Sequence, residues 1–370
     1  MQLRSSHLSR NEEIILTLRS LYESYGYSRC AVGTFEAYDF YARNRSALSG
    51  EEVLVFTDAD GRLMALKPDV TMSIVRHVQE QTPGLRKLCY NENIYRIPTG
   101  GAGFRESVQT GLECIGELDD YTIGEVLMLA LKSLANVGSS YILNLSHLGL
   151  LDGLLEQALE PGTDRSPLLK AMAQKNLPAL RTVCRENRME PQWEEALVTL
   201  TGLYGSLRDT LPQVRTLCRG EKMETACQEL QSLGELLEVY GLGDHLHLDF
   251  SIRGGIDYYS GLIFRGFVSG ASSPVLSGGR YDRLISRMGK SGGGIGFAVY
   301  LDQLERQKTA APEALVLLLY DDTVPAEQVI RRVSVLKQDG IRVRAERQIP
   351  ADCRYTRLLK LTKDGVTELE

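Results

Sequence analysis

The chain has 370 residues, of which 43% are hydrophobic and 24% are charged, and its formal net charge is −6. This is an ordinary globular composition, and the length predicts two or three domains with ample core. The acidic balance gives no support for a large phosphate-binding surface, so a small ligand or a protein is the expected partner and tRNA is not.

The cysteines and the N-terminus bear on compartment and metal binding. The seven cysteines form no CxxC pair and have no histidine at metal-ligand spacing, so we expect free thiols in a reducing cytosol and no metal site. The N-terminus lacks the apolar segment of a signal peptide, and no apolar run approaches the length that spans a membrane. These features predict a cytoplasmic protein without a membrane segment.

The first part of the chain alternates helical and strand-like segments. Apolar residues recur at helical spacing over residues 8–26, and an Asp-Gly turn divides a predicted hairpin over residues 52–66. We then expect a helix from Pro68 to about residue 81, strands over 86–96 and 106–116, a helix over 121–137 and a strand over 141–145.

The amino-acid composition changes in the second part of the chain. Residues 150–240 are rich in Leu, Ala, Gln and Glu at helical spacing, which predicts a helical insertion. Strands are expected over 245–252, 262–269 and 273–277, and the glycine run 292–296 is expected to lead into a helix over 297–307. Because hairpins outnumber βαβ units, we predict an α+β fold with an antiparallel sheet, with domains over 1–310 and 311–370.

Two segments place polar residues where they could hold a ligand. Asp69 and Thr71 lie at the expected start of a helix, where an acid is stabilised by the helix dipole but could also bind an ammonium group. Gln109 and Glu113 share one face of a strand, and Gly111 between them would leave open space on the sheet. A solvent-facing polar stripe is the alternative, and the pattern alone does not decide between them.

Two later segments combine glycines with tyrosines. Residues 253–264 fit a close-approach loop that feeds a strand, in which Tyr258 and Tyr259 could wall a planar ligand or simply pack a hairpin. Residues 277–282 contain Tyr281 and precede the glycine run before Phe297. A glycine run that opens a helix can approach a phosphate, although many turns have the same sequence.

Together and in this order, the four segments resemble the histidyl-tRNA synthetase family over residues 8–310. The family pattern Arg-Pro-Glu-x-Thr appears as Lys67 to Thr71, and the two strands of its motif 2 appear as Ile94 to Arg96 and Arg105 to Glu113. Its histidine signature is matched by Gly-Ile-Asp-Tyr-Tyr at 255–259, and Gly-Gly-Arg-Tyr-Asp stands at 278–282. The resemblance implies a class II aminoacyl-tRNA synthetase-like core.

The resemblance also implies roles for individual residues. In such a site Asp69, Thr71 and Gln109 would bind the ammonium end of an amino acid. Arg96 would hold its carboxylate. The imidazole of histidine would lie among the side chains Glu113, Tyr259 and Tyr281, and Tyr258 would be a further histidine-binding residue.

Departures from the family concern the groups that perform adenylation. The family's catalytic arginine falls on Gly254, although a bulge could return Arg253 to the site as a carboxylate or phosphate contact. In the motif 3 pattern Gly-Phe-Ala-x-Gly-x-Glu-Arg-Leu, which aligns with residues 296–304, Gln303 replaces the ATP-binding arginine. Arg306 lies about one helical turn further on. Losing both arginines would cost many orders of magnitude in rate, so no catalytic residue is predicted.

The regulatory subunits of ATP phosphoribosyltransferase are a family with these losses, and the chain resembles them. They typically have aspartate where synthetases have glutamate in the Pro-x-x-Thr segment, as this chain has at Asp69. This resemblance implies a histidine ligand, no cofactor, a short-form catalytic subunit as partner, and a homodimer within a hetero-oligomer. Two alternatives remain open. One is a divergent histidyl-tRNA synthetase or adenylating paralogue that uses Arg253 or Arg306, and the other is a homodimeric sensor of another amino acid.

Overall fold

The computed structural model describes residues 8–48, 53–78, 84–97, 103–252, 258–305, 315–338, 342–351, 353 and 355–369. The chain divides into two compact units, Met1–Gln307 and Lys308–Glu370, each of which is considered by itself. None of the helices in the described ranges is long and apolar enough to cross a membrane.

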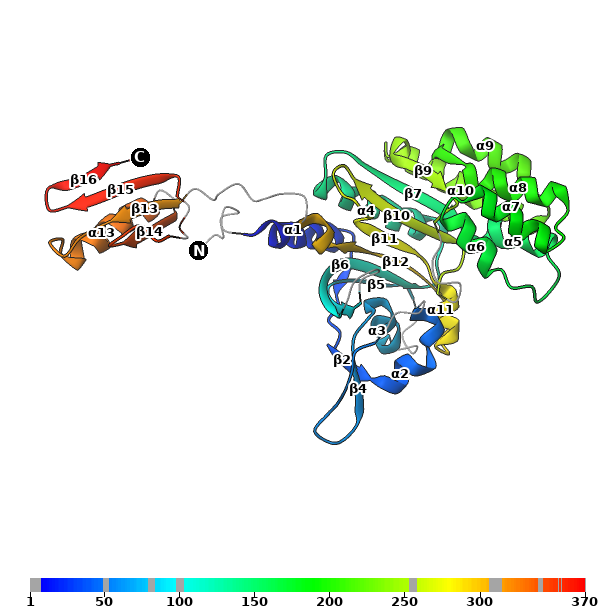
Figure 1. Cartoon of the computed structure of the whole chain (residues 1–370), viewed down its shortest axis with the longest axis horizontal. Coiled ribbons are helices and arrows are strands. Elements are labelled where there is room, and N and C mark those ends of the chain that lie inside the picture. Colours follow the sequence, from blue (N-terminus) through cyan, green and yellow to red (C-terminus); the bar gives the residue numbers. More distant parts are fainter. Residues whose placement is uncertain are drawn as a thin grey trace. The chain divides into compact units, whose positions relative to one another are not determined.

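The first unit is organised around a large mixed sheet (Figure 1). Its strands, in spatial order within the described residues, are β1 (Ser28–Arg29), β5 (Arg86–Arg96), β6 (Arg105–Gly116), β12 (Gly293–Tyr300), β11 (Leu276–Arg280), β10 (Leu262–Val268), β7 (Tyr141–His147), β9 (Leu246–Asp249) and β8 (Tyr204–Ser206). From β5 to β7 every neighbouring pair is antiparallel. This confirms the predicted α+β fold with an antiparallel sheet.

Two helices, α1 (Arg10–Ser24) and α4 (Asp120–Val137), cover one face of this sheet. A capping box starts α1, because Ser9 accepts from the amide of Glu12 while the Glu12 carboxylate accepts from the Ser9 amide. Strand residues alternate between faces, so Leu112 and Phe297 pack with these helices in the main core. The same alternation sends Gln109 and Glu113 to the opposite face.

Several short elements stand over that opposite face. They are α2 (Tyr38–Arg43), the 3₁₀ helix Arg45–Leu48, α3 (Val70–His77) and α11 (Asp282–Arg287), with a small sheet of β2 (Phe35–Ala37), β4 (Leu63–Leu66) and β3 (Val55–Thr57). Helix α12 (Leu301–Glu305) follows β12 and places Leu301 and Leu304 in the main core. The predicted hairpin is confirmed as β3 and β4, and Gly61 in its turn has φ of +79°. The helix expected from Pro68 begins at Val70, because Asp69 is its N-cap.

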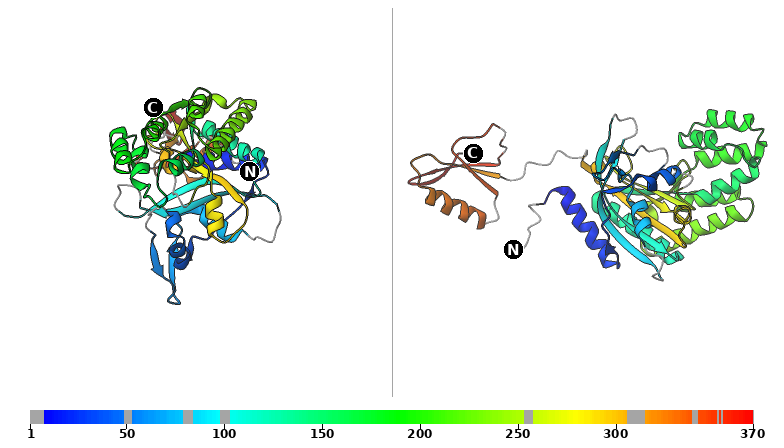
Figure 2. Two further views of the ribbon diagram at one scale, coloured as in Figure 1. Left: turned by 90° about the vertical axis from the view of Figure 1, so that its right-hand side faces the viewer. Right: turned by 90° about the horizontal axis from the view of Figure 1, so that it is seen from below.

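The region in which the sequence predicts a helical insertion contains a series of helices. Its helices gather on one side of the first unit (Figure 2). They are α5 (Leu148–Ala158), α6 (Ser166–Ala173), α7 (Leu177–Glu186), α8 (Pro191–Gly202), α9 (Leu207–Leu217) and α10 (Glu221–Val239), followed by the 3₁₀ helix Gly243–His245.

The glycine run 292–296 does not open a helix, so that prediction was wrong. It lies largely in β12, and the following helix α12 begins only at Leu301. These glycines are needed for packing between distant segments. A Cβ on Gly294 would lie 2.1 Å from the Tyr281 ring, and a Cβ on Gly296 would lie 2.0 Å from Oε2 of Glu113. No phosphate-binding loop at a helix start is therefore formed by this run.

The second unit is a small α/β structure, as the sequence predicts. Its described strands follow the order β14 (Arg342–Glu346), β13 (Leu315–Leu319), β15 (Arg357–Thr362) and β16 (Gly365–Glu368), with helix α13 (Ala326–Gln338). The central strand β13 is parallel to both neighbours. Val316, Leu318 and Leu359 form its core with Leu336 of the helix.

Candidate functional site

A cavity of about 650 Å³ lies on the face of the main sheet that α1 and α4 leave uncovered. All eight of the described residues predicted to bind histidine line it: Asp69, Thr71, Arg96, Gln109, Glu113, Tyr258, Tyr259 and Tyr281. The fold thus brings together side chains that are up to 212 positions apart in the chain, from Asp69 to Tyr281. Arg253, Gly254 and Arg306, which the sequence analysis also named, lie outside the described residues.

Glu113 is the most enclosed acid of the cavity, with 1% of its surface exposed. Thr71 lies 2.5 Å from its Oε1 and the Tyr281 hydroxyl lies 2.6 Å from its Oε2. Gln109 on the same face is 4% exposed, so the alternative of a solvent-facing stripe is wrong. The polar face of β6 is instead the floor of a cavity.

Burial raises the pKa of Glu113 to about 8, although its two hydroxyl partners lower it and the nearby Asp69 raises it further. This raised pKa favours the protonated form of the carboxyl group at neutral pH. The Thr71 and Tyr281 hydroxyls donate to this group, one to each oxygen.

Glycines in the neighbouring strands make room for the side chains of the site. Gly296 lies directly opposite Glu113 in the sheet, and the Glu113 carboxylate extends over it. Gly279 lies under the ring of Tyr259, because a Cβ there would be 2.8 Å from Cδ1 of the tyrosine. These close approaches require glycine at both positions.

Gly111 has a different role from the one predicted. The space above it is not open for a ligand, because the Tyr90 ring fills it. A Cβ on Gly111 would lie 2.8 Å from the Tyr90 hydroxyl and 2.1 Å from the backbone oxygen of Phe297. The glycine between Gln109 and Glu113 therefore accommodates a tyrosine of β5, which itself lines the cavity.

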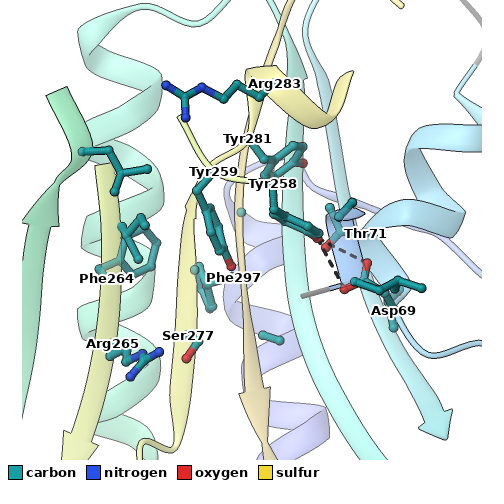
Figure 3. Close-up of a pocket in the computed structure, with 18 of the residues that line it drawn as sticks. Asp69, Thr71, Tyr258, Tyr259, Phe264, Arg265, Ser277, Tyr281, Arg283 and Phe297 are labelled. Carbon is teal, nitrogen blue, oxygen red and sulfur yellow. Dashed lines mark hydrogen bonds between the residues drawn. The ribbon is translucent and has the colours of Figure 1, made fainter. Parts of the chain in front are cut away.

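Asp69 serves the helix and the cavity at once. Its Oδ1 accepts a 2.7 Å hydrogen bond from the Met72 amide, which confirms the expected stabilisation of a helix start. The Tyr258 hydroxyl donates to the same carboxylate at 3.2 Å (Figure 3). Nη2 of Arg96 lies 3.3 Å from Oδ2. A second carboxylate thus faces the cavity, held between a helix amide and an arginine.

The three predicted tyrosines pack against one another. The rings of Tyr258 and Tyr259 lie 4.8 Å apart, and those of Tyr258 and Tyr281 meet edge to face at 6.3 Å. Burial holds the pKa of the Tyr258 and Tyr281 hydroxyls well above the ordinary value, so both groups stay neutral donors. Such a wall suits a flat polar ring.

Some lining residues were missed by sequence reasoning. They include Tyr90, Arg265, Ser277 and Tyr300 from the sheet, together with Asp152 and Arg165 from the helical insertion. Figure 3 shows Arg265 beside Ser277, the residue paired with it across β10 and β11. A two-residue alternation from Gly296 through Ala298 to Tyr300 would have revealed Tyr300, had the segment been recognised as a strand.

Gln303 is bonded to its own chain neighbour. Its Nε2 donates to Oδ2 of Asp302 at 3.1 Å, and Ser107 donates to Oδ1 of the same aspartate at 2.9 Å. Gln303 is absent from the cavity lining within the described residues. Over the same ranges, no cluster of three His, Cys, Asp or Glu residues could hold a metal ion.

Known proteins share this sequence and fold. The histidyl-tRNA synthetase family matches residues 2–304. An ATP phosphoribosyltransferase regulatory subunit from Clostridium kluyveri is 31% identical over 77% of this chain and 74% of its own length.

Two solved structures are similar in fold. One is an ATP phosphoribosyltransferase regulatory subunit/histidyl-tRNA synthetase from Bacillus halodurans, with a TM-score of 0.75 at 24% identity over 93% of this chain and 91% of that one. The other is an ATP phosphoribosyl transferase complex from Thermotoga maritima, with a TM-score of 0.62 at 20% identity over 78% and 96%. The chain therefore belongs to the ATP phosphoribosyltransferase regulatory subunit family, whose members have a class II histidyl-tRNA synthetase-like fold.

Proposed function

We propose that the chain is a non-catalytic regulatory subunit of ATP phosphoribosyltransferase in histidine biosynthesis, and that it binds histidine in the cavity above the main sheet. The main support for histidine as the ligand is the environment of Glu113. A buried carboxyl group that stands among tyrosines, with a pKa of about 8, can share one proton with an imidazole.

The proposed pose follows from the placement of the charged groups. The imidazole lies against Glu113 and Tyr281, where a neutral ring nitrogen exchanges hydrogen bonds with the carboxyl group and the hydroxyl. The ammonium group lies near the Asp69 carboxylate and Gln109. The carboxylate of the ligand lies toward Arg96, whose charge is partly balanced by Asp69 at 3.3 Å.

The proposed partner is the short-form catalytic subunit of the transferase, in the cytoplasm, with the chain forming a homodimer within a hetero-oligomer. The family membership and the likeness to a chain of the Thermotoga maritima complex support this assignment. Histidine would regulate by binding one of two states of the assembly more tightly, which shifts their populations by that difference in affinity.

Gln303 supports the absence of adenylation in this proposal. An amide carries no charge to stabilise transferring phosphoryl oxygens, and the Gln303 amide is already hydrogen-bonded to Asp302.

A histidine-tRNA ligase remains the second candidate, favoured by the family match over residues 2–304. Histidine-dependent pyrophosphate exchange would establish that candidate.

Calorimetric titration of histidine into the full chain tests the ligand, with Glu113→Gln as the variant and Glu13→Gln, on the exposed side of α1, as the matched control. We expect binding by the wild type and the control and at least tenfold weaker binding by Glu113→Gln. Size-exclusion chromatography with the short transferase tests the partner. The absence of both histidine binding and a complex would refute the proposed function.

A further inference from the structure

The side chains on the cavity-facing side of β12 increase abruptly in size along the strand. Every second residue of the strand points to the same face of the sheet, and in order these are Gly294, Gly296, Ala298 and Tyr300, of which the last three line the cavity. The first three residues have at most a methyl group as side chain, so other side chains or a ligand can lie directly over the strand. Tyr300, on the same face, has a full aromatic ring that projects from the strand.

The cavity ends at this ring. Tyr300 pairs with Gln109 across β12 and β6, and both residues line the cavity. The next residue of β6 on that face, Ser107, is not among the described lining residues, and its hydroxyl donates to Asp302 instead. Beyond the Gln109 and Tyr300 row, Asp302 accepts hydrogen bonds from Ser107 and Gln303, and none of these three residues is among the described lining of the cavity.

Tyr300 is held in place by neighbours from other strands. Its hydroxyl interacts with the hydroxyl of Ser277, which lowers the tyrosine pKa, while burial has the larger effect and raises it. Arg96, Arg265 and Asp69 are close enough to act on the same hydroxyl electrostatically. The half-buried ring lines the cavity at this end of β12, where it is the boundary between the cavity and the sheet end.

The length of the cavity floor sets what fits inside this boundary. Tyr300 lies four residues further along the strand than Gly296, which is beneath Glu113, and this corresponds to a rise of about 13 Å. An amino acid whose side chain meets Glu113 and whose carboxylate points toward Arg96 lies along this direction. Any group attached to that carboxylate would extend toward the Tyr300 ring.

We propose that Tyr300 is a specificity-determining wall, which admits a free amino acid and excludes molecules that carry a bulky substituent on the carboxyl group. The exclusion is steric, because Tyr300 and Gln109 together close the end of the cavity. This inference rests on the proposed histidine site and specifies the class of ligand that the site accepts.

Two ligands that differ only in bulk test the wall. Histidinamide and histidine benzylamide both lack the carboxylate charge, so the ratio of their affinities reports the space near Tyr300. Competition against bound histidine gives this ratio for the full chain and for Tyr300→Gly, Tyr300→Ala and Tyr300→Phe. Circular dichroism melting of each variant identifies any that fails to fold.

The wild type should bind histidinamide at least tenfold more tightly than the benzylamide. Tyr300→Gly or Tyr300→Ala should shift the ratio toward the benzylamide by at least tenfold, while Tyr300→Phe, which keeps the ring, should leave it within twofold. A ratio that is the same in wild type, Gly and Ala variants would overturn the wall while leaving histidine binding intact. If the wild type binds no histidine, the proposed function fails and the inference falls with it.

Discussion

The Glu113 carboxylate lies directly over Gly296, the residue paired with it across β6 and β12. The glycine has an ordinary backbone conformation and is needed only because a side chain from the next strand occupies the space above it. The Glu113 carboxylate therefore depends on two features: Gly296 leaves the space that it occupies, and hydrogen bonds with Thr71 and Tyr281 hold it there.

Gly296→Ala should abolish ligand binding and destabilise the fold. The added Cβ would meet Glu113 at 2.0 Å and the Leu112 backbone oxygen at 2.4 Å, so the strands must shift. Overpacking of this kind costs about 1–3 kcal/mol. Urea unfolding and histidine calorimetry would measure both effects, with Gly202→Ala, which has nothing within 4 Å of the new Cβ, as the control. Equal behaviour of the two variants would contradict the prediction.

The raised pKa of Glu113 predicts a stability that falls with pH. The folded chain keeps the proton up to a pKa of about 8, while the unfolded chain loses it near 4.5. Stability from this group is thus complete below 4.5 and is lost as the pH rises through 8, with a slope of at most about 1.4 kcal/mol per pH unit. Urea unfolding of wild type and Glu113→Gln from pH 5 to 8.5 should show the wild type losing stability relative to the variant. A constant difference would sink the prediction.

Histidine affinity should be greatest between about pH 6.5 and 8. The complex holds one proton between Glu113 and the imidazole, whereas below the imidazole pKa of about 6.5 the free partners hold two and above about 8 they hold none. Affinity should therefore fall up to tenfold per unit on either side, as measured by calorimetry from pH 5 to 9. Glu113→Gln should lose the change near pH 8 and keep the one near 6.5. An affinity that still rises below pH 6 would be incompatible with a shared proton.

Asp69 has a structural and a proposed binding role, which two substitutions separate. Asp69→Asn keeps an oxygen that can accept from the Met72 amide but removes the charge. Asp69→Ala removes both, and loss of the cap costs about 1 kcal/mol. We expect both variants to lose histidine affinity by at least tenfold, and only the alanine variant to lose substantial stability. If Asp69→Asn bound histidine as the wild type does, Asp69 would be a helix cap only.

The Lys67 and Glu92 ion pair should be important for stability. Lys67 is 1% exposed, and its Nζ lies 2.6 Å from Oε2 of Glu92. Lys67→Ala leaves Glu92 without its cation in a mostly buried position, which costs about 3–5 kcal/mol. Arg43→Ala, at an exposed pair with Asp39, is the control and should give no measurable change in the same urea unfolding experiment. A small loss for Lys67→Ala would show that Glu92 finds another partner.

The sequence alone was sufficient for features that depend on nearby residues. The Asp60-Gly61 turn specified the hairpin of β3 and β4, because only local backbone geometry is involved. The alternation along β6 put Gln109 and Glu113 on one face, since side chains in a strand repeat every two residues. The ordered motifs also identified the eight cavity residues that the described structure brings together.

The tertiary structure decided what occupies the space around those residues. From the sequence, the glycine run 292–296 is predicted to lead into a helix and Gly111 to leave open space on the sheet. In the structure Tyr281 and Glu113 lie over two glycines of the run, and the Tyr90 ring fills the space over Gly111. Burial of Glu113, which raises its pKa to about 8, and the position of Tyr300 at the end of the cavity have the same origin. Local periodicity determines the direction of a side chain, but desolvation and steric limits come from neighbours that are distant in the chain, and only the packed fold specifies those neighbours.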